Sequence, residues 1–220
     1  ADNEEDAEAG YVQITGGSIA VTADGDGVDA QTDVVMTGGT VEVTAGGGST
    51  ATPSDDVSAK GLKAGVILVL EAGTVDVDAA DDAVHSNGAV HLSGGALTAA
   101  SGDDGVHAEE GLIIDDGTVT VTASTEGLEG ADIAISGGST SVTSSDDGIN
   151  AAGGSTSTTP QGGGGGEQVG DFSLVISGGT LVVDAGGDGL DSNGTASITG
   201  GTVVVNGPTT SGNGALDVNG

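Results

Sequence analysis

The sequence predicts an all-β protein, a right-handed parallel β-helix of about eight 22-residue coils with three short strands per coil. Two-residue turns recur along the chain, and the first residues of neighbouring turns, such as Gly16 and Gly38 or Gly94 and Asp116, lie 22 residues apart. After each turn, apolar and polar residues alternate with period two, which is typical of strands with one buried face. The 45 glycines, and the lack of any apolar stripe at helical spacing, disfavour helices.

Each predicted coil contains three strands. The first follows the turn, as at residues 75–79, the second follows an acidic loop, as at 106–108, and the third precedes the next turn, as at 112–114. A single coil of this kind cannot bury its own apolar residues, whereas stacked coils can. We therefore expect a narrow, continuous core of Val, Ile, Leu and Ala.

The domain organisation follows from where this repeat holds. An acidic tail at residues 1–10 precedes a single β-helix domain at residues 11–220. Two segments, at about 46–59 and 152–170, interrupt the 22-residue repeat and are rich in Gly, Ser, Thr and Pro. Such compositions are typical of surface loops, so we expect two loop insertions that leave the stack of coils intact.

The charge of the chain restricts its partners. The chain has 34 acidic residues and two basic ones, a formal net charge of −32. This charge argues against nucleic acid and anionic membranes as partners, and no apolar run is long enough to insert into a membrane. It favours cations as partners and a location outside the cell or on its surface, with a signal peptide that is not part of this chain.

Alignment of the coils on their turns places the acidic residues in columns. Successive coils lie about 4.8 Å apart, so the carboxylates of one column repel each other unless a cation lies between them. Groups of oxygen ligands suit Ca²⁺, while diffuse counterions are the alternative. The predicted metal ligands are Asp26, Asp29, Asp82, Asp103, Asp104, Glu126, Glu129, Asp146, Asp147, Asp188 and Asp191.

One coil carries lysines in these columns, and two others carry histidines. Lys60 and Lys63 lie where their ammonium groups could compensate the acidic charge in place of a cation. His85 and His107 lie in adjacent coils beside Asp82 and Asp104, an arrangement compatible with a transition metal. The first acidic column contains Asp26, Lys60, Asp82, Asp104, Glu126, Asp147 and Asp188. A Gly follows it in most coils, and we expect this Gly to fit a tight bend with positive φ.

Two segments, Ile135–Gly154 and Gly207–Gly220, resemble secreted bacterial carbohydrate-binding β-helix proteins, a family similar in fold to pectate lyases that includes cellulose-binding members. The family's Asp-Asp-Gly-Ile motif corresponds to residues 103–106 and 146–149 and, more loosely, to 81–84. The resemblance implies a right-handed parallel β-helix, bound calcium, an extracellular location, and binding of cellulose or an acidic polysaccharide.

Three functions remain open at this point. Carbohydrate binding follows from the resemblance, but only Tyr11 and Phe172 offer aromatic rings for a sugar, so the binding residues stay unassigned. A structural role is the alternative, in which solenoids without capping helices stack end to end into a cation-stabilised homopolymer. A polysaccharide lyase is the lesser alternative, because the chain has no Arg and only Lys60 or Lys63 could act as a base.

Overall fold

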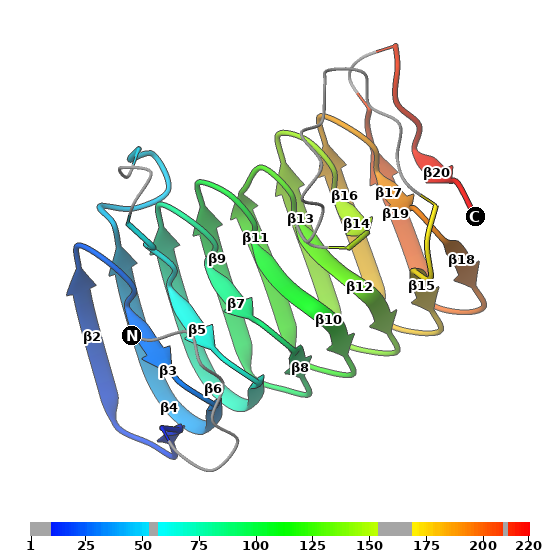
Figure 1. The fold of residues 1–220 in the computed structure, drawn as a ribbon. Helices are drawn as coiled ribbons and strands as arrows, with labels where there is room; N and C mark the ends of the chain where they lie inside the picture. Colours follow the sequence, from blue (N-terminus) through cyan, green and yellow to red (C-terminus); the bar gives the residue numbers. More distant parts are fainter. Residues whose placement is uncertain (1–9, 53–56, 154–168, 209–210) are drawn as a thin grey trace.

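The computed structural model describes residues 10–52, 57–153, 169–208 and 211–220. Within these ranges the chain forms twenty β-strands and no helix. All recorded strand pairings are parallel, and Figure 1 shows the strands following one another in a curved stack from the N-terminal to the C-terminal end. The predicted all-β class with parallel strands is therefore confirmed.

The strands form three rows, and within each row a strand pairs with its equivalent in the next coil. Row A, which follows the turns, contains β2 (Ser18–Ala23), the second half of β4 (Asp33–Ala45), the second half of β6 (Ile67–Ala79), β9 (Ala96–Ser101), β11 (Thr118–Ala123), β13 (Ser139–Ser144), β16 (Thr180–Ala185) and β19 (Thr202–Asn206). Row B, which follows the acidic loops, contains β3 (Val28–Ala30), β5 (Leu62–Ala64), β7 (Val84–Ser86), the first parts of β10 (Val106–Ile114) and β12 (Leu128–Ile135), β14 (Ile149–Ala151), β17 (Leu190–Ser192) and β20 (Leu216–Val218). Row C contains β1 (Val12–Ile14), the first parts of β4 and β6, β8 (Ala89–Leu92), the last parts of β10 and β12, β15 (Ser173–Ile176) and β18 (Thr195–Ile198).

Three separate strands per coil are not found throughout. In β4 and β6 the strands of rows C and A join across the Gly turn, and in β10 and β12 the strands of rows B and C join instead. The pairing continues through these bends with a local shift of register, for example between Met36 and Thr40 and between Ala108 and Gly111. Pairing between neighbouring coils therefore continues through bends at which the sequence predicts that one strand ends and another begins.

The core lies between the three rows and consists of the residues that the alternating pattern predicts to point inward. Val75, Val77 and Ala79 of β6 are each at most 2% exposed, and Leu112 and Ile114 of β10 are fully buried. The end coils differ because no further coil covers them within the described residues. The corresponding inward positions are more exposed there, with Ile19 at 36% and Ile198 at 47%.

Glycine serves two different purposes in a coil. The second turn residue has positive φ in every coil, for example 100° at Gly39 and 105° at Gly73. The Gly after the first acidic column lies at a bend, as expected, but it does not have the expected positive φ. A Cβ on Gly105 would lie 2.6 Å from the carbonyl oxygen of Gly127, and one coil accepts Ala83 at this position. Close approach of the next coil, rather than backbone conformation, favours Gly here.

The two predicted insertions lie between different rows of strands. The chain leaves row A at Ala45 and enters row B at Leu62, and it leaves row B at Ala151 and enters row C at Ser173. Residues 53–56 of the first insertion, 154–168 of the second and 1–9 of the acidic tail lie outside the described residues. Among the residues described, no helix is long and apolar enough to cross a membrane.

The core makes a direct prediction about stability. Leu112→Ala should lower the free energy of unfolding by about 2–5 kcal/mol, because it removes buried methyl groups and leaves a cavity between coils. Ile113→Ala is the matched control, since Ile113 points outward and is 38% exposed. Urea unfolding followed by circular dichroism measures both. Equal losses in the two variants would contradict the placement of the core.

Candidate functional site

The loops that join row A to row B carry most of the predicted ligands, and we call this surface the acidic edge. Its first column is tied to the backbone of the next coil. Asp26 Oδ1 accepts the N–H of Lys60 at 2.9 Å, Asp82 Oδ1 accepts that of Asp104 at 3.2 Å, and Asp147 Oδ1 accepts that of Asp188 at 2.6 Å. These carboxylates therefore have a structural role, because each uses one oxygen to satisfy a backbone donor.

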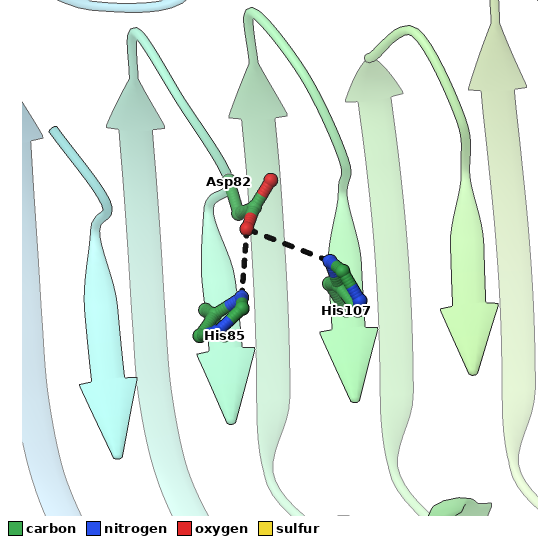
Figure 2. A group of neighbouring side chains, drawn as sticks. All are labelled: Asp82, His85 and His107. Carbon is green, nitrogen blue, oxygen red and sulfur yellow. Dashed lines mark hydrogen bonds and ion pairs between the residues drawn. The ribbon is translucent and has the colours of Figure 1, made fainter. Parts of the chain in front are cut away.

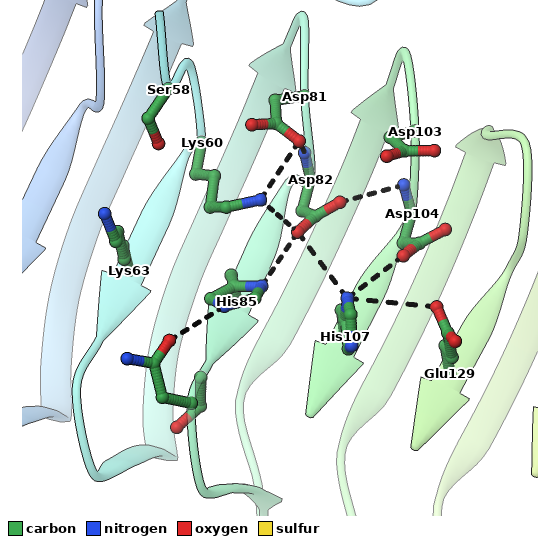
Figure 3. Close-up of polar contacts among 12 residues, drawn as sticks. Ser58, Lys60, Lys63, Asp81, Asp82, His85, Asp103, Asp104, His107 and Glu129 are labelled. Atoms are coloured by element: carbon green, nitrogen blue, oxygen red, sulfur yellow. Dashed lines mark hydrogen bonds and ion pairs between the residues drawn. The ribbon is translucent and has the colours of Figure 1, made fainter. Parts of the chain in front are cut away.

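The lysine coil supplies the positive charge at the N-terminal part of the edge. Lys60 Nζ lies 3.0 Å from Asp81 Oδ1 and 2.5 Å from Asp82 Oδ2 (Figure 3). Burial alone would lower the pKa of Lys60, but the charges of Asp82 and Asp81 outweigh it and raise this pKa. Lys63 Nζ lies 3.2 Å from Asp26 Oδ2. Each ammonium group thus contacts a carboxylate of a neighbouring coil, as the predicted charge compensation requires.

A mixed cluster of carboxylates and imidazoles lies next to the lysine coil. Asp82 Oδ2 is 2.8 Å from His85 Nδ1 and 3.7 Å from His107 Nδ1 (Figure 2). His107 Nδ1 also lies 3.1 Å from Asp104 Oδ2 and 3.8 Å from Glu129 Oε2 (Figure 3). Two sets of potential metal ligands overlap here, Asp82 with His85 and His107, and Asp104 with His107 and Glu129.

The electrostatics of this cluster follow from its crowding. Burial opposes a charge on His107, but its hydrogen bonds to Asp104 and Asp82 and the charge of Glu129 prevail and raise its pKa to about 11. Burial likewise opposes a charge on Asp82, yet hydrogen bonds from His107, His85 and Lys60 hold the pKa of this carboxyl well below its usual range. Burial, a hydrogen bond to Asp104 and the nearby charges raise the pKa of Glu129.

Further along the edge, oxygen atoms are the only potential ligands. Asn150 Nδ2 donates to Glu126 Oε2 at 2.7 Å, while Asn150 Oδ1 is buried without a hydrogen-bond partner. Burial and the charges of Asp104, Asp147 and Asp146 raise the pKa of Glu126 to about 7, although the bond from Asn150 opposes this. A buried amide oxygen without a donor, beside crowded carboxylates, fits the oxygen shell of a hard cation such as Ca²⁺. Glu126, Asp147 and Asn150 are the residues that would hold it.

The remaining predicted ligands are spread along the edge. Asp103 joins Asp81 and Asp82 in a third set of potential metal ligands, and burial and the charges of Asp104, Asp82 and Asp81 raise its pKa to about 6. Asp29 and Asp146 are exposed, whereas Asp188 and Asp191 are 7% and 2% exposed. The side chain of Asp188 accepts the N–H of Gly214.

Three further polar residues of this edge are not among the predicted ligands. Asp81 binds Lys60, Asn87 Oδ1 lies 3.1 Å from His85 Nε2, and Asn150 binds Glu126. The pair Asp81-Asp82 repeats the doublets Asp103-Asp104 and Asp146-Asp147, and this repetition is the signal that identifies Asp81. Asn87 carries no such signal.

Row A presents a second regular surface, which we call the row A face. Its outward side chains lie in register across the coils and are exposed or half-buried. One column is almost entirely hydroxyl and consists of Ser18, Thr40, Thr74, Ala96, Thr118, Ser139, Thr180 and Thr202. The column beside it contains Glu42, Asp76, Thr98, Thr120 and Ser141 in the middle coils, and Ala20, Val182 and Val204 toward the two ends. The row A face thus offers hydrogen-bond donors and acceptors at a spacing of about 4.8 Å.

The raised pKa values predict how the metal-free protein responds to pH. Asp103 and Glu126 bind protons more tightly when folded, so their contribution to stability is lost as pH rises through their folded pKa values of about 6 and about 7. The melting temperature in chelator should therefore fall from about pH 4.5 to about pH 7.5. Added Ca²⁺ should reverse the fall at the higher pH. Scanning calorimetry measures this, and a melting temperature that rises with pH in chelator would contradict the account.

Comparison with known proteins gives one result. The family described as carbohydrate-binding domain-containing protein matches residues 1–105 and again residues 100–219. Two matches to one family are what a chain of repeated coils should give. No curated protein and no solved structure matches the chain.

Proposed function

The chain belongs to the family of carbohydrate-binding domain-containing proteins, and we propose that it is a secreted, non-catalytic protein that binds extracellular polysaccharide. We further propose that its stacked strands wind as a right-handed parallel β-helix, the usual hand of parallel connections. The family supports the ligand class, and the excess of acidic residues supports a location where cations are abundant.

The row A face is the surface that we propose for the polysaccharide. This rests on one observation, the in-register array of hydroxyl and carboxylate groups across its coils. An extended glycan presents hydroxyl groups at regular intervals, and such an array can donate to and accept from them. Aromatic stacking is not the basis, since Tyr11 lies at the first coil and Phe172 is half-buried on the other side of the acidic edge.

Calcium is part of this proposal and is assigned to the oxygen-only part of the acidic edge. Glu126, Asp147 and Asn150 would hold the ion, and Asn150 Oδ1 would gain the partner that it lacks. The charge of the ion would relieve repulsion between coils and keep the row A face in register. An acidic glycan could bind further Ca²⁺ between its own carboxylates and those of Asp76 or Glu42.

Variants of the row A face test the proposal. Asp76→Ala combined with Thr98→Ala should weaken retention on cellulose or polygalacturonate about 10-fold, because each change removes a hydrogen-bonding group. Depletion assays with and without Ca²⁺ measure this for each polymer. Asp132→Ala combined with Thr195→Ala is the matched control, since both residues are exposed on row C. If the unmodified chain bound neither polymer, the proposal would be wrong. If both double variants lost the same amount of binding, the row A face would not be the binding surface.

A second candidate function is that of a structural subunit. Leu216, Val218 and Ile198 are exposed on the last described coils at 59%, 43% and 47%, and Tyr11 at the first is 68% exposed. Strand edges with apolar side chains are surfaces on which another copy could stack. In that case electron microscopy with Ca²⁺ should show filaments that shorten in chelator. A chain that stays monomeric at high concentration in Ca²⁺ would exclude this candidate.

A further inference from the structure

We propose that Asp82, His85 and His107 form a binding site for a transition metal ion of the zinc type, separate from the calcium site and independent of the polysaccharide proposal. The site lies where β7 and β10 run side by side, so that its ligands come from two adjacent coils (Figure 2). The two imidazole rings are in register, with centroids 4.9 Å apart and an interplanar angle of 78°.

The two separations from Asp82 Oδ2 to the imidazole nitrogens bracket the value expected for a tetrahedral ion. Ligands about 2.0 Å from a tetrahedral zinc ion are about 3.3 Å from one another. Asp82 Oδ2 lies 2.8 Å from His85 Nδ1 and 3.7 Å from His107 Nδ1, which brackets this value. Asp104 Oδ2, 3.1 Å from His107 Nδ1, belongs to the second, overlapping set of potential ligands with Glu129. Little rearrangement would therefore separate the metal-free and metal-bound forms.

His85 provides an observation that does not depend on these separations. Its Nδ1 faces Asp82 Oδ2, and its Nε2 faces Asn87 Oδ1 at 3.1 Å. Both facing atoms are acceptors, whereas a neutral imidazole has only one N–H to donate, so His85 satisfies both only with a second proton or with a metal ion. A metal ion on Nδ1 removes this conflict, because Nε2–H then donates to Asn87 Oδ1. An oxygen that accepts from the second ring nitrogen is the usual support of a metal-bound histidine.

His107 has an excess of acceptors at one ring nitrogen, whereas its Nε2 is buried without a hydrogen-bond partner. Oxygens of Asp82, Asp104 and Glu129 lie 3.7, 3.1 and 3.8 Å from its Nδ1. A single proton on Nδ1 can form a good hydrogen bond to only one of the three. A divalent cation in the same place would interact with all of them, once it displaces the proton that these oxygens hold on His107.

The donor set selects the metal. Imidazole nitrogen suits zinc, copper and nickel, whereas Ca²⁺ takes oxygen ligands. Lys60 strengthens this choice. Its ammonium group occupies the other side of Asp82 Oδ2 and contacts Asp81, so part of the negative charge that would attract Ca²⁺ is already neutralised. Lys60 would remain as a hydrogen-bond donor to the ligating carboxylate (Figure 3).

Zinc binding to the whole chain tests the site. Calorimetric titration of the chain with Zn²⁺, in a buffer that contains excess Ca²⁺, should show one tight zinc site. His85→Ala and His107→Ala should each weaken it at least about 100-fold, since loss of an outer-shell partner alone can cost that much. His91→Ala is the matched control, because the described residues of β8 place His91 on row C, paired with Asp115, and its loss should leave the affinity within about 2-fold.

X-ray absorption spectroscopy of the zinc-loaded, unmodified chain keeps the test decisive if a variant fails to fold. The spectrum should show two imidazole nitrogens among four ligands. A shell of oxygen alone, displacement of zinc by Ca²⁺, absence of tight zinc binding, or full affinity in both histidine variants would each overturn the proposal.

Discussion

The structure depends on one constraint, the spacing of about 4.8 Å at which parallel coils place equivalent residues beside one another. In the core this spacing is favourable, because Val, Ile and Leu of one coil pack on those of the next. On the acidic edge it is unfavourable, because two carboxylates at that distance repel by about 3 kcal/mol at an effective dielectric of 20. Every polar contact along the edge can be understood as a way of limiting this cost.

The edge limits the repulsion in a different way in each part. At the lysine coil, tethered ammonium groups lie between the carboxylates of neighbouring coils. At the next coils, imidazoles take that place, and Asp82 contacts both of them. Beyond them only oxygen groups remain, with Glu126 beside a buried Asn150. The lysine coil carries its own positive charge, the imidazole part holds a proton or a metal ion, and the third part requires a cation or a proton from solution.

The sequence predicts those parts of the fold that depend on local periodicity. Alternation identifies Val75, Val77 and Leu112 as inward residues because a strand has a period of two whatever its neighbours are. It also identifies the acidic columns, since the 22-residue repeat places Asp82 beside Asp104. It does not predict the joined strands β4 and β10, because continuity through a bend depends on hydrogen bonds to the adjacent coils.

The same limit applies to the site. That Asp82 accepts the N–H of Asp104 depends on the direction of the Asp82 side chain in the loop, which no spacing in the sequence encodes. The sequence does not reveal why Gly is favoured after the acidic column for a similar reason, because the close approach of the neighbouring coil is a three-dimensional fact. Asn87 could not be found either, since its contact with His85 follows from the turn between β7 and β8.

Anomalous diffraction from crystals soaked with both Ca²⁺ and Zn²⁺ tests most directly the claim that the acidic edge is divided by donor type. Data on both sides of the zinc edge distinguish the two ions. The account predicts zinc at Asp82, His85 and His107, and calcium at Glu126 and Asn150. Zinc and calcium sharing one position, or an edge that binds neither ion in the presence of both, would contradict it.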